Sequence, residues 1–193
     1  MNLKDVFSRV YRLIVDCQGE WGKIEEEHAT LHTVRREFLF PMMACLLLTR
    51  FFCLWWNVPD MTEVENYLSY FLKGLGVTLA EVFVGFYLAY LFAMIAERVR
   101  YVAGIIPDAM EVFKLLLYSS SILWAIQMLT DLFSILFFLK VASVYVVFVL
   151  WTGIPIVQKR VQEEKRSVLA IVLFLLIYAC PLLVEKILSK LMY

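Results

Sequence analysis

Three ionisable residues, Arg50, Glu81 and Lys140, stand inside long apolar stretches of the sequence. An isolated charge is costly in lipid, so such residues pair with one another or mark a pathway for protons or ions. Along helices that rise 1.5 Å per residue, all three fall within about two turns of one membrane boundary. We therefore predict that Glu81 pairs with Arg50 or Lys140. A structural pair is favoured over a proton or ion step, because no second acidic residue lies deeper to continue a relay.

The stretch around Glu81, Gly74 to Ala96, is long enough to cross a bilayer as a helix, which takes about 20 apolar residues. Small or polar residues recur within it at spacings of three and four, so they share one side of the helix with Glu81. Small residues let a second helix approach closely, and a buried carboxylate needs a partner that lipid cannot supply. The helix-packing face predicted on this basis consists of Thr78, Gly85, Ala89 and Ala93.

The composition places the chain among membrane proteins. Of its 193 residues, 62% are hydrophobic, and the mean hydropathy is +0.76, which is too apolar for an ordinary soluble domain. The 18 acidic and 18 basic residues balance, and the basic ones are scattered among the apolar stretches. This distribution argues against nucleic acid as a partner.

Motifs of enzymes and cofactor sites are missing from the sequence. It has no Gly-rich nucleotide loop, no GxSxG and no HExxH, and no histidine lies at membrane depth to activate the serines at 119–121. An intramembrane hydrolase therefore has the least support. His28 and His32 stand four apart but lack the further ligands of a defined metal pattern. We expect no enzymatic activity, no cofactor, no metal site and no disulfide framework, since the cysteines form no CxxC pair.

Apolar stretches predict an all-α, multi-pass transmembrane bundle of five spans. The spans are expected at about residues 38–56, 74–96, 112–130, 135–157 and 168–188. Residues 57–73 are interpreted as a polar connection, Asp131 and Ser134 as the signals of a short turn, and Gly153 to Pro155 as the place of a kink. Residues 1–37 then form a cytoplasmic lead, and residues 38–190 form the membrane domain.

The distribution of Lys and Arg predicts the orientation of the five spans. Four of these residues fall on one side, Lys73, Lys140, Lys186 and Lys190, and Arg50 lies inside a span. Thirteen fall on the side of the N-terminus: Lys4, Arg9, Arg12, Lys23, Arg35, Arg36, Arg98, Arg100, Lys114, Lys159, Arg160, Lys165 and Arg166. Because basic residues collect on the cytoplasmic side, the N-terminus is expected in the cytoplasm and the C-terminus outside.

The lead begins with an amphipathic segment at residues 3–15. Charged residues occupy one side of this helix, and its apolar stripe consists of Leu3, Val6, Phe7, Val10, Tyr11 and Ile14. The pattern fits a helix that lies in the membrane surface, and it fits equally well a helix packed under the bundle. Trp21, which follows, is interpreted as a residue of the membrane interface.

Short motifs accompany this layout. Trp21-Gly22-Lys23-Ile24 lies in the lead, Phe40-Pro41 at the mouth of the first span, and Leu150-Trp151-Thr152-Gly153 before a charged turn. Together with five closely spaced spans, they resemble the Yip-domain family, the Ypt/Rab-interacting membrane proteins, in its shorter bacterial form. The resemblance implies a multi-pass protein without an established enzymatic activity, linked in eukaryotic relatives to vesicle transport and membrane shaping. The Asp-Leu-Tyr-Gly-Pro signature of the eukaryotic members is absent here.

Two classes of function remain open. The first is a non-enzymatic protein of a bacterial inner membrane that organises the lipid bilayer or binds a membrane partner, either another membrane protein or a second copy. The second is a transporter, or an accessory subunit of one, that uses the cluster of Arg50, Glu81 and Lys140. Helix breaks at Pro155 and Pro181 motivate the second class, but five spans show no inverted repeat.

Overall fold

A computed structural model of the chain describes residues 3–56, 64–98, 109–158 and 163–192, except for some side chains within these ranges, such as those of Glu81 and Ala93. Every regular element in these four ranges is helical. Three helical segments among them are long and apolar enough to cross a membrane, namely Met110–Leu132, Ile135–Val157 and Arg166–Val184. The chain is therefore an all-helical protein with the features of an integral membrane protein.

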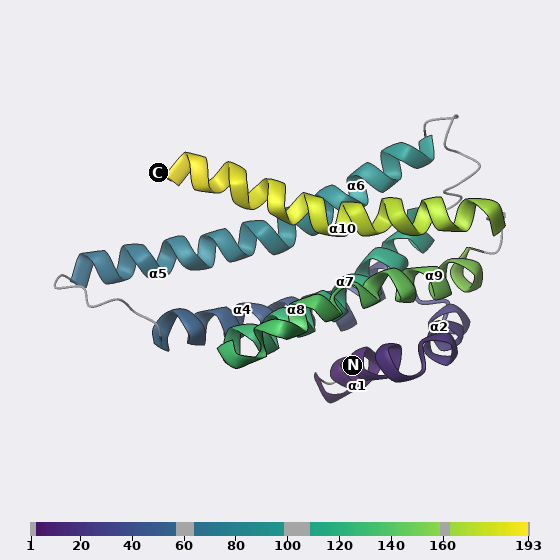
Figure 1. The fold of residues 1–193 in the computed structure, drawn as a ribbon, viewed down its shortest axis with the longest axis horizontal. Helices are drawn as coiled ribbons and strands as arrows, with labels where there is room; N and C mark the ends of the chain where they lie inside the picture. Colours follow the sequence, from purple (N-terminus) through teal and green to yellow (C-terminus); the bar gives the residue numbers. More distant parts are fainter. Residues whose placement is uncertain (1–2, 57–63, 99–108, 159–162, 193) are drawn as a thin grey trace.

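Two helices, α1 (Leu3–Val15) and α2 (Cys17–Glu26), precede the bundle. Five helical runs follow in the described residues and run back and forth along the long axis of the molecule (Figure 1). In chain order they are α3 (Leu31–Val34), η1 (Arg35–Leu39) and α4 (Phe40–Trp56); α5 (Val64–Leu79), η2 (Ala80–Val84) and α6 (Gly85–Arg98); α7 (Ala109–Leu132); η3 (Ser134–Phe138), α8 (Leu139–Ala142) and α9 (Tyr145–Val157); and α10 (Glu163–Met192).

One predicted feature of the chain between the helices is wrong. Residues 64–73, interpreted as part of a polar connection, belong to α5, because their apolar residues continue the helical pattern and Phe71 packs its ring 4.7 Å from that of Phe51. In the fourth run, α9 continues through Gly153 and Pro155, and the kink expected there stays a prediction. A further break in this run lies at residues 143–144, between α8 and α9.

The α1–α2 pair is packed onto the bundle. Helix α2 lies along α9, and α1 contacts α7 and α4. Trp21 of α2 is fully buried, so its predicted place at the membrane interface is wrong, and its Nε1 donates a hydrogen bond to the carbonyl of Val149 at 3.1 Å. Gly153 makes room for this ring: a Cβ there would lie 2.5 Å from Cε2 of Trp21, so a larger residue would displace the indole.

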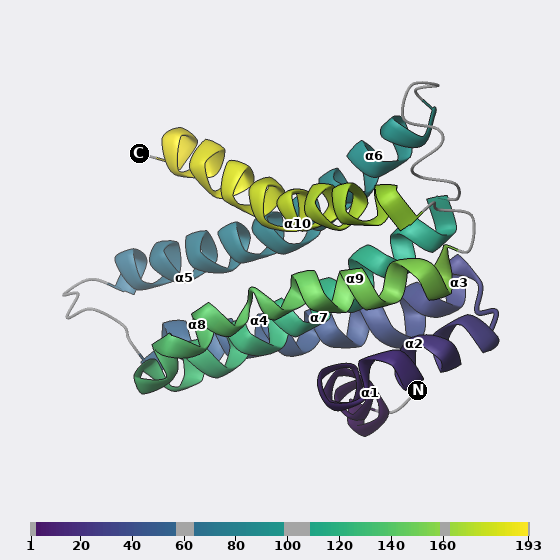
Figure 2. The same ribbon diagram turned by 45° about the vertical axis from the view of Figure 1, so that its right-hand side comes forward.

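Helix α1 uses its apolar residues in two ways. Val6, Val10 and Leu13 are buried against the bundle, whereas other large apolar residues remain exposed: Leu3, Phe7, Tyr11, Ile14 and Val15. In Figure 2, α1 is seen nearly end-on while α7 and α9 run across the view, so α1 is inclined to the helices of the bundle. The predicted apolar stripe is thus divided between a side that packs on protein and a side that does not.

Candidate functional site

Part of the helix-packing face predicted around Glu81 lies at the crossing of α6 and α10. Gly85 and Ala89 of α6 are buried, Thr78 is buried in α5, and the side chain of Ala93 is outside the described part of the chain. The two helices approach closely at Gly85, where a Cβ would lie 2.9 Å from Cα of Pro181. Gly85 therefore lets α10 approach at the turn that carries Pro181, and both residues border a pocket beside the crossing.

The pocket has a volume of about 320 Å³ and is enclosed by residues of α4, α6, α7, α8 and α10. Helix α7 supplies one continuous side, since its lining residues recur every three or four positions from Ser120 to Asp131. Apolar walls come mainly from Phe86, Trp124, Ile177 and Leu182. The charged and polar residues in the wall are Arg50, Ser120, Gln127, Thr130, Asp131, Lys140, Ser143 and Tyr178.

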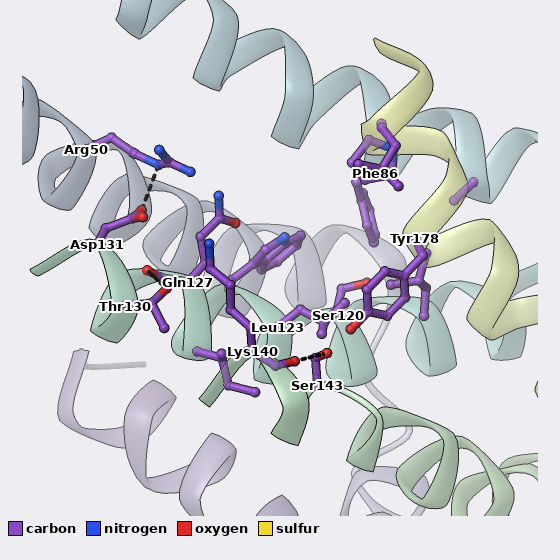
Figure 3. A pocket seen from close by; sticks show the side chains of 17 residues that line it. Arg50, Phe86, Ser120, Leu123, Gln127, Thr130, Asp131, Lys140, Ser143 and Tyr178 are labelled. Atoms are coloured by element: carbon purple, nitrogen blue, oxygen red, sulfur yellow. Dashed lines mark hydrogen bonds and ion pairs between the residues drawn. The ribbon is translucent and has the colours of Figure 1, made fainter. Parts of the chain in front are cut away.

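An ion pair joins two helices at one end of this pocket. Nε of Arg50 in α4 lies 2.7 Å from Oδ2 of Asp131 in the last turn of α7. Both side chains are largely covered, with exposed fractions of 31% and 17%. Figure 3 shows this pair at one end of the pocket and Phe86 and Tyr178 towards the other. The pocket therefore has its ion pair at one end, and hydroxyl and aromatic side chains at the other.

The structure brings two of the three predicted charged residues to the same cavity. Arg50 and Lys140 both line it, and Lys140 is exposed at the start of the short helix α8. Glu81 belongs to the π-helical turn η2, but its side chain lies outside the described part of the chain, so its predicted pairing stays a prediction. The carboxylate that contacts Arg50 in the structure is Asp131.

Asp131 was interpreted only as a turn signal, although the sequence held a clue to its role. The first and third spans run in the same direction, so residues near the end of each lie at similar depth. Arg50 precedes Trp56 by six positions, and Asp131 falls at the end of the third span. Depth alone allows the contact, but it does not say that the two side chains point towards each other.

A second charge cluster, which the sequence analysis missed, fixes α1 to α2 and to α7. Glu20 of α2 is only 1% exposed and pairs with two cations, Nε of Arg9 at 3.2 Å and Nε of Arg12 at 2.8 Å. Arg9 also pairs with Glu27, with Nη1 at 2.9 Å from Oε2, and Nη1 donates to the hydroxyl of Tyr118 at 3.2 Å. We name Arg9, Arg12, Glu20 and Glu27 the lead cluster.

The environment of Arg9 keeps it charged. Burial by itself lowers the pKa of Arg9, but its hydrogen bonds to Glu27 and Tyr118, and the charge of Glu27, outweigh that effect. The net result is a pKa raised above its ordinary value. Close opposite charges and hydrogen bonds to the charged form both act in this direction. Arg9 is thus a permanently charged link between α1, α2 and α7.

No known protein family, curated protein or solved structure matches the chain. The geometry must therefore carry the argument about function. The two clusters differ in kind, because protein contacts cover Glu20 at the centre of the lead cluster and the Arg50–Asp131 pair faces a cavity. The described lining residues of that cavity include hydroxyls, one carboxylate and two cations.

Proposed function

We propose that the chain is a non-enzymatic integral membrane protein of Yip-domain type, in which the five helical runs span a bacterial inner membrane with the N-terminus in the cytoplasm. Its role is to organise the membrane or to bind a membrane partner, and α1 is the element that does so. The resemblance in the short motifs, the alternating helical runs and the excess of basic residues near the N-terminal side support this proposal.

The observation that carries the proposal is the divided apolar surface of α1. Val6, Val10 and Leu13 already satisfy the packing of this helix on the bundle. Phe7 and Ile14 keep exposed fractions of 42% and 44% after that packing. A helix with an apolar side turned away from its own protein suits the boundary between headgroups and acyl chains. The lead cluster and Trp21 would hold α1 rigidly at that boundary.

Fluorescence quenching by brominated lipids tests the position of α1. A bimane label is attached at Phe7→Cys in the full chain, with the four native cysteines replaced by Ala, and the protein is reconstituted in nanodiscs. We expect lipids brominated near the headgroup to quench this label strongly. The matched control is Lys4→Cys, an exposed position on the charged side of the same helix, where quenching should be weak. Equal quenching at both positions contradicts an interfacial α1.

A second pair of variants separates folding from membrane contact. Val6→Glu places a charge in the packed side of α1 and should destabilise the protein. Phe7→Glu places it on the exposed side and should leave the melting temperature in detergent nearly unchanged while it releases α1 from lipid. If Phe7→Glu destabilises the protein as much as Val6→Glu, the exposed side is part of the fold and the proposed role of α1 is wrong.

The pocket favours one alternative, a transporter or an accessory subunit of a transporter. A cavity that holds Arg50 and Lys140 beside the turn of Pro181 has the polar lining that a transported solute requires. Purified protein in liposomes should then support a flux of protons or solute that Glu81→Gln or Asp131→Asn abolishes. Under the non-enzymatic proposal, liposomes with wild-type protein and with either variant show the same flux as empty liposomes.

A further inference from the structure

We propose that the pocket between α4, α7, α8 and α10 binds the anionic head of an amphiphile, a phosphate or carboxylate that carries a hydrocarbon chain. The inference goes beyond the proposed function, since it concerns a ligand site that no described residue of α1 or α2 lines. It depends neither on the role of α1 nor on transport. Three features of the pocket lead to it: its charge, its unsatisfied hydroxyl and its shape.

The charged end of the pocket suits an anion. Among the described lining side chains there are two cations, Arg50 and Lys140, and one carboxylate, Asp131. Asp131 contacts Arg50 through Nε at 2.7 Å. A guanidinium has five N–H donors in a fork, so one such contact leaves donors for a second oxyanion. Lys140 adds an ammonium from α8, whose three donors bind phosphate or carboxylate as a point charge.

The end of the pocket away from Arg50 offers hydroxyl groups. The hydroxyl of Tyr178 is buried and has no hydrogen-bond partner among the described atoms, although its residue lines the pocket. A buried polar group without a partner costs about 1–3 kcal/mol, so this hydroxyl indicates that a ligand or water supplies the partner. Figure 3 shows the Tyr178 ring in the wall on the side of Ser120, across the pocket from Arg50. Ester or hydroxyl oxygens behind an anionic head would meet it there.

The shape of the pocket matches an amphiphile better than a free ion. A volume of about 320 Å³ is at the lower end for small-molecule sites, and it is far larger than the roughly 30 Å³ that a water occupies in the liquid. Phe86 lies in the part away from Arg50 and Asp131, and Trp124 and Ile177 add apolar lining. Leu182 belongs to the lining and is also 55% exposed, so the lining reaches the outer surface of α10. A hydrocarbon chain can leave through that side.

The experiment measures lipid binding to the purified full chain. Protein in dodecyl maltoside is titrated with phosphatidylglycerol, which is anionic, or phosphatidylcholine, which carries the same phosphate but no net charge. Native mass spectrometry counts bound lipids, and thermal unfolding reports the stabilisation that a ligand of the folded state must give. A third titration uses inorganic phosphate alone. We expect one phosphatidylglycerol per chain with a raised melting temperature, and little effect of phosphatidylcholine or inorganic phosphate.

Three variants locate the site. Lys140→Gln removes an exposed charge of the pocket and should weaken phosphatidylglycerol binding at least tenfold while the protein stays folded. Lys73→Gln is the matched control, because Lys73 is also exposed and is predicted on the same side of the membrane, but it does not line the pocket. Leu123→Trp fills the cavity from α7 without changing charge, and it should also weaken binding. If Lys140→Gln does not fold, the comparison of Leu123→Trp with wild type decides.

Several results would overturn the inference. If Lys140→Gln binds phosphatidylglycerol as tightly as wild type, the lipid binds elsewhere. If Lys140→Gln does not fold, the same conclusion follows from unchanged binding in Leu123→Trp. An equal loss in Lys73→Gln would reduce the effect to general surface charge. Equal binding of phosphatidylcholine would remove the selectivity for an anion. If inorganic phosphate stabilises the protein as much as phosphatidylglycerol, the site takes a free anion, and the hydrocarbon part of the inference is wrong.

Discussion

The lead cluster and the Arg50–Asp131 pair both hold charges inside an apolar bundle, but in different surroundings. Glu20 is enclosed by two arginines and is 1% exposed, and α2 packs directly on α9 beside it. Asp131 contacts one arginine and faces a cavity of about 320 Å³ with Lys140 in its wall. The carboxylate that protein contacts enclose serves the fold, whereas charges that border a cavity can also meet a ligand.

The largest effect is expected from a change in the lead cluster. Glu20→Gln leaves Arg9 and Arg12 near each other without their shared carboxylate, and removal of one partner from a buried ion pair costs about 3 kcal/mol. We expect a loss of unfolding free energy of about that size in detergent, measured by denaturant titration. The control is Lys23→Gln, since Lys23 reaches Glu20 only at 4.0 Å from an exposed position. A loss below about 1 kcal/mol would show that the lead cluster does not fasten α1 and α2.

The next largest effect is expected where α2 packs on α9, at the contact of Trp21 with Gly153. Gly153→Ala puts a methyl group 2.5 Å from the indole of Trp21, a rigid ring that must move as a whole. Overpacking of this kind costs about 1–3 kcal/mol. Gly76→Ala is the matched control, because a Cβ at Gly76 meets no atom within 4 Å and should not destabilise the helix. The double variant Trp21→Leu/Gly153→Ala should show coupling, and simple additivity of the two losses would contradict the contact.

A smaller effect is expected from the pair that borders the cavity. A double-mutant cycle with Arg50→Gln and Asp131→Asn should give a coupling free energy of about 0.6 kcal/mol, the average for polar contacts between membrane helices. Both side chains can turn to water or a ligand in the cavity when the partner is lost. The measurement is unfolding of each variant in detergent. A coupling free energy as large as the loss of unfolding free energy in Glu20→Gln would mean that the Arg50–Asp131 pair and the lead cluster contribute equally to stability.

A change of pH tests the closure of α2, and at neutral pH it leaves the stability unchanged. Burial raises the pKa of the Cys17 thiol to about 11 from an ordinary value of about 9. The folded protein therefore favours the neutral thiol: this contribution to stability is complete below about pH 9 and is lost as the pH rises towards 11. Only the thiolate reacts, so iodoacetamide should alkylate Cys17 at pH 8 about 100-fold more slowly than in denatured protein. Equal rates, followed by mass spectrometry of the Cys17 peptide, would mean that α2 is not closed to solvent.

The sequence by itself determined the features that depend on composition and local period. Apolar length gives the helices of the three segments that can cross a membrane. A recurrence at three and four positions put Thr78, Gly85 and Ala89 on one side of a helix, where all three are buried. The same rule gave the apolar stripe of α1, because the side on which a residue lies follows from its position within one helix.

Only the tertiary structure decided which of these sides meet. Three contacts show this: Asp131 with Arg50, Trp21 over Gly153, and Glu20 with both Arg9 and Arg12. Each depends on how two helices are rotated and shifted relative to each other, which the period within one helix does not determine. The division of the α1 stripe between Val6 and Phe7 has the same origin, since both residues are apolar and adjacent. A periodic pattern fixes directions within a helix, while a contact depends on the placement of two helices relative to each other.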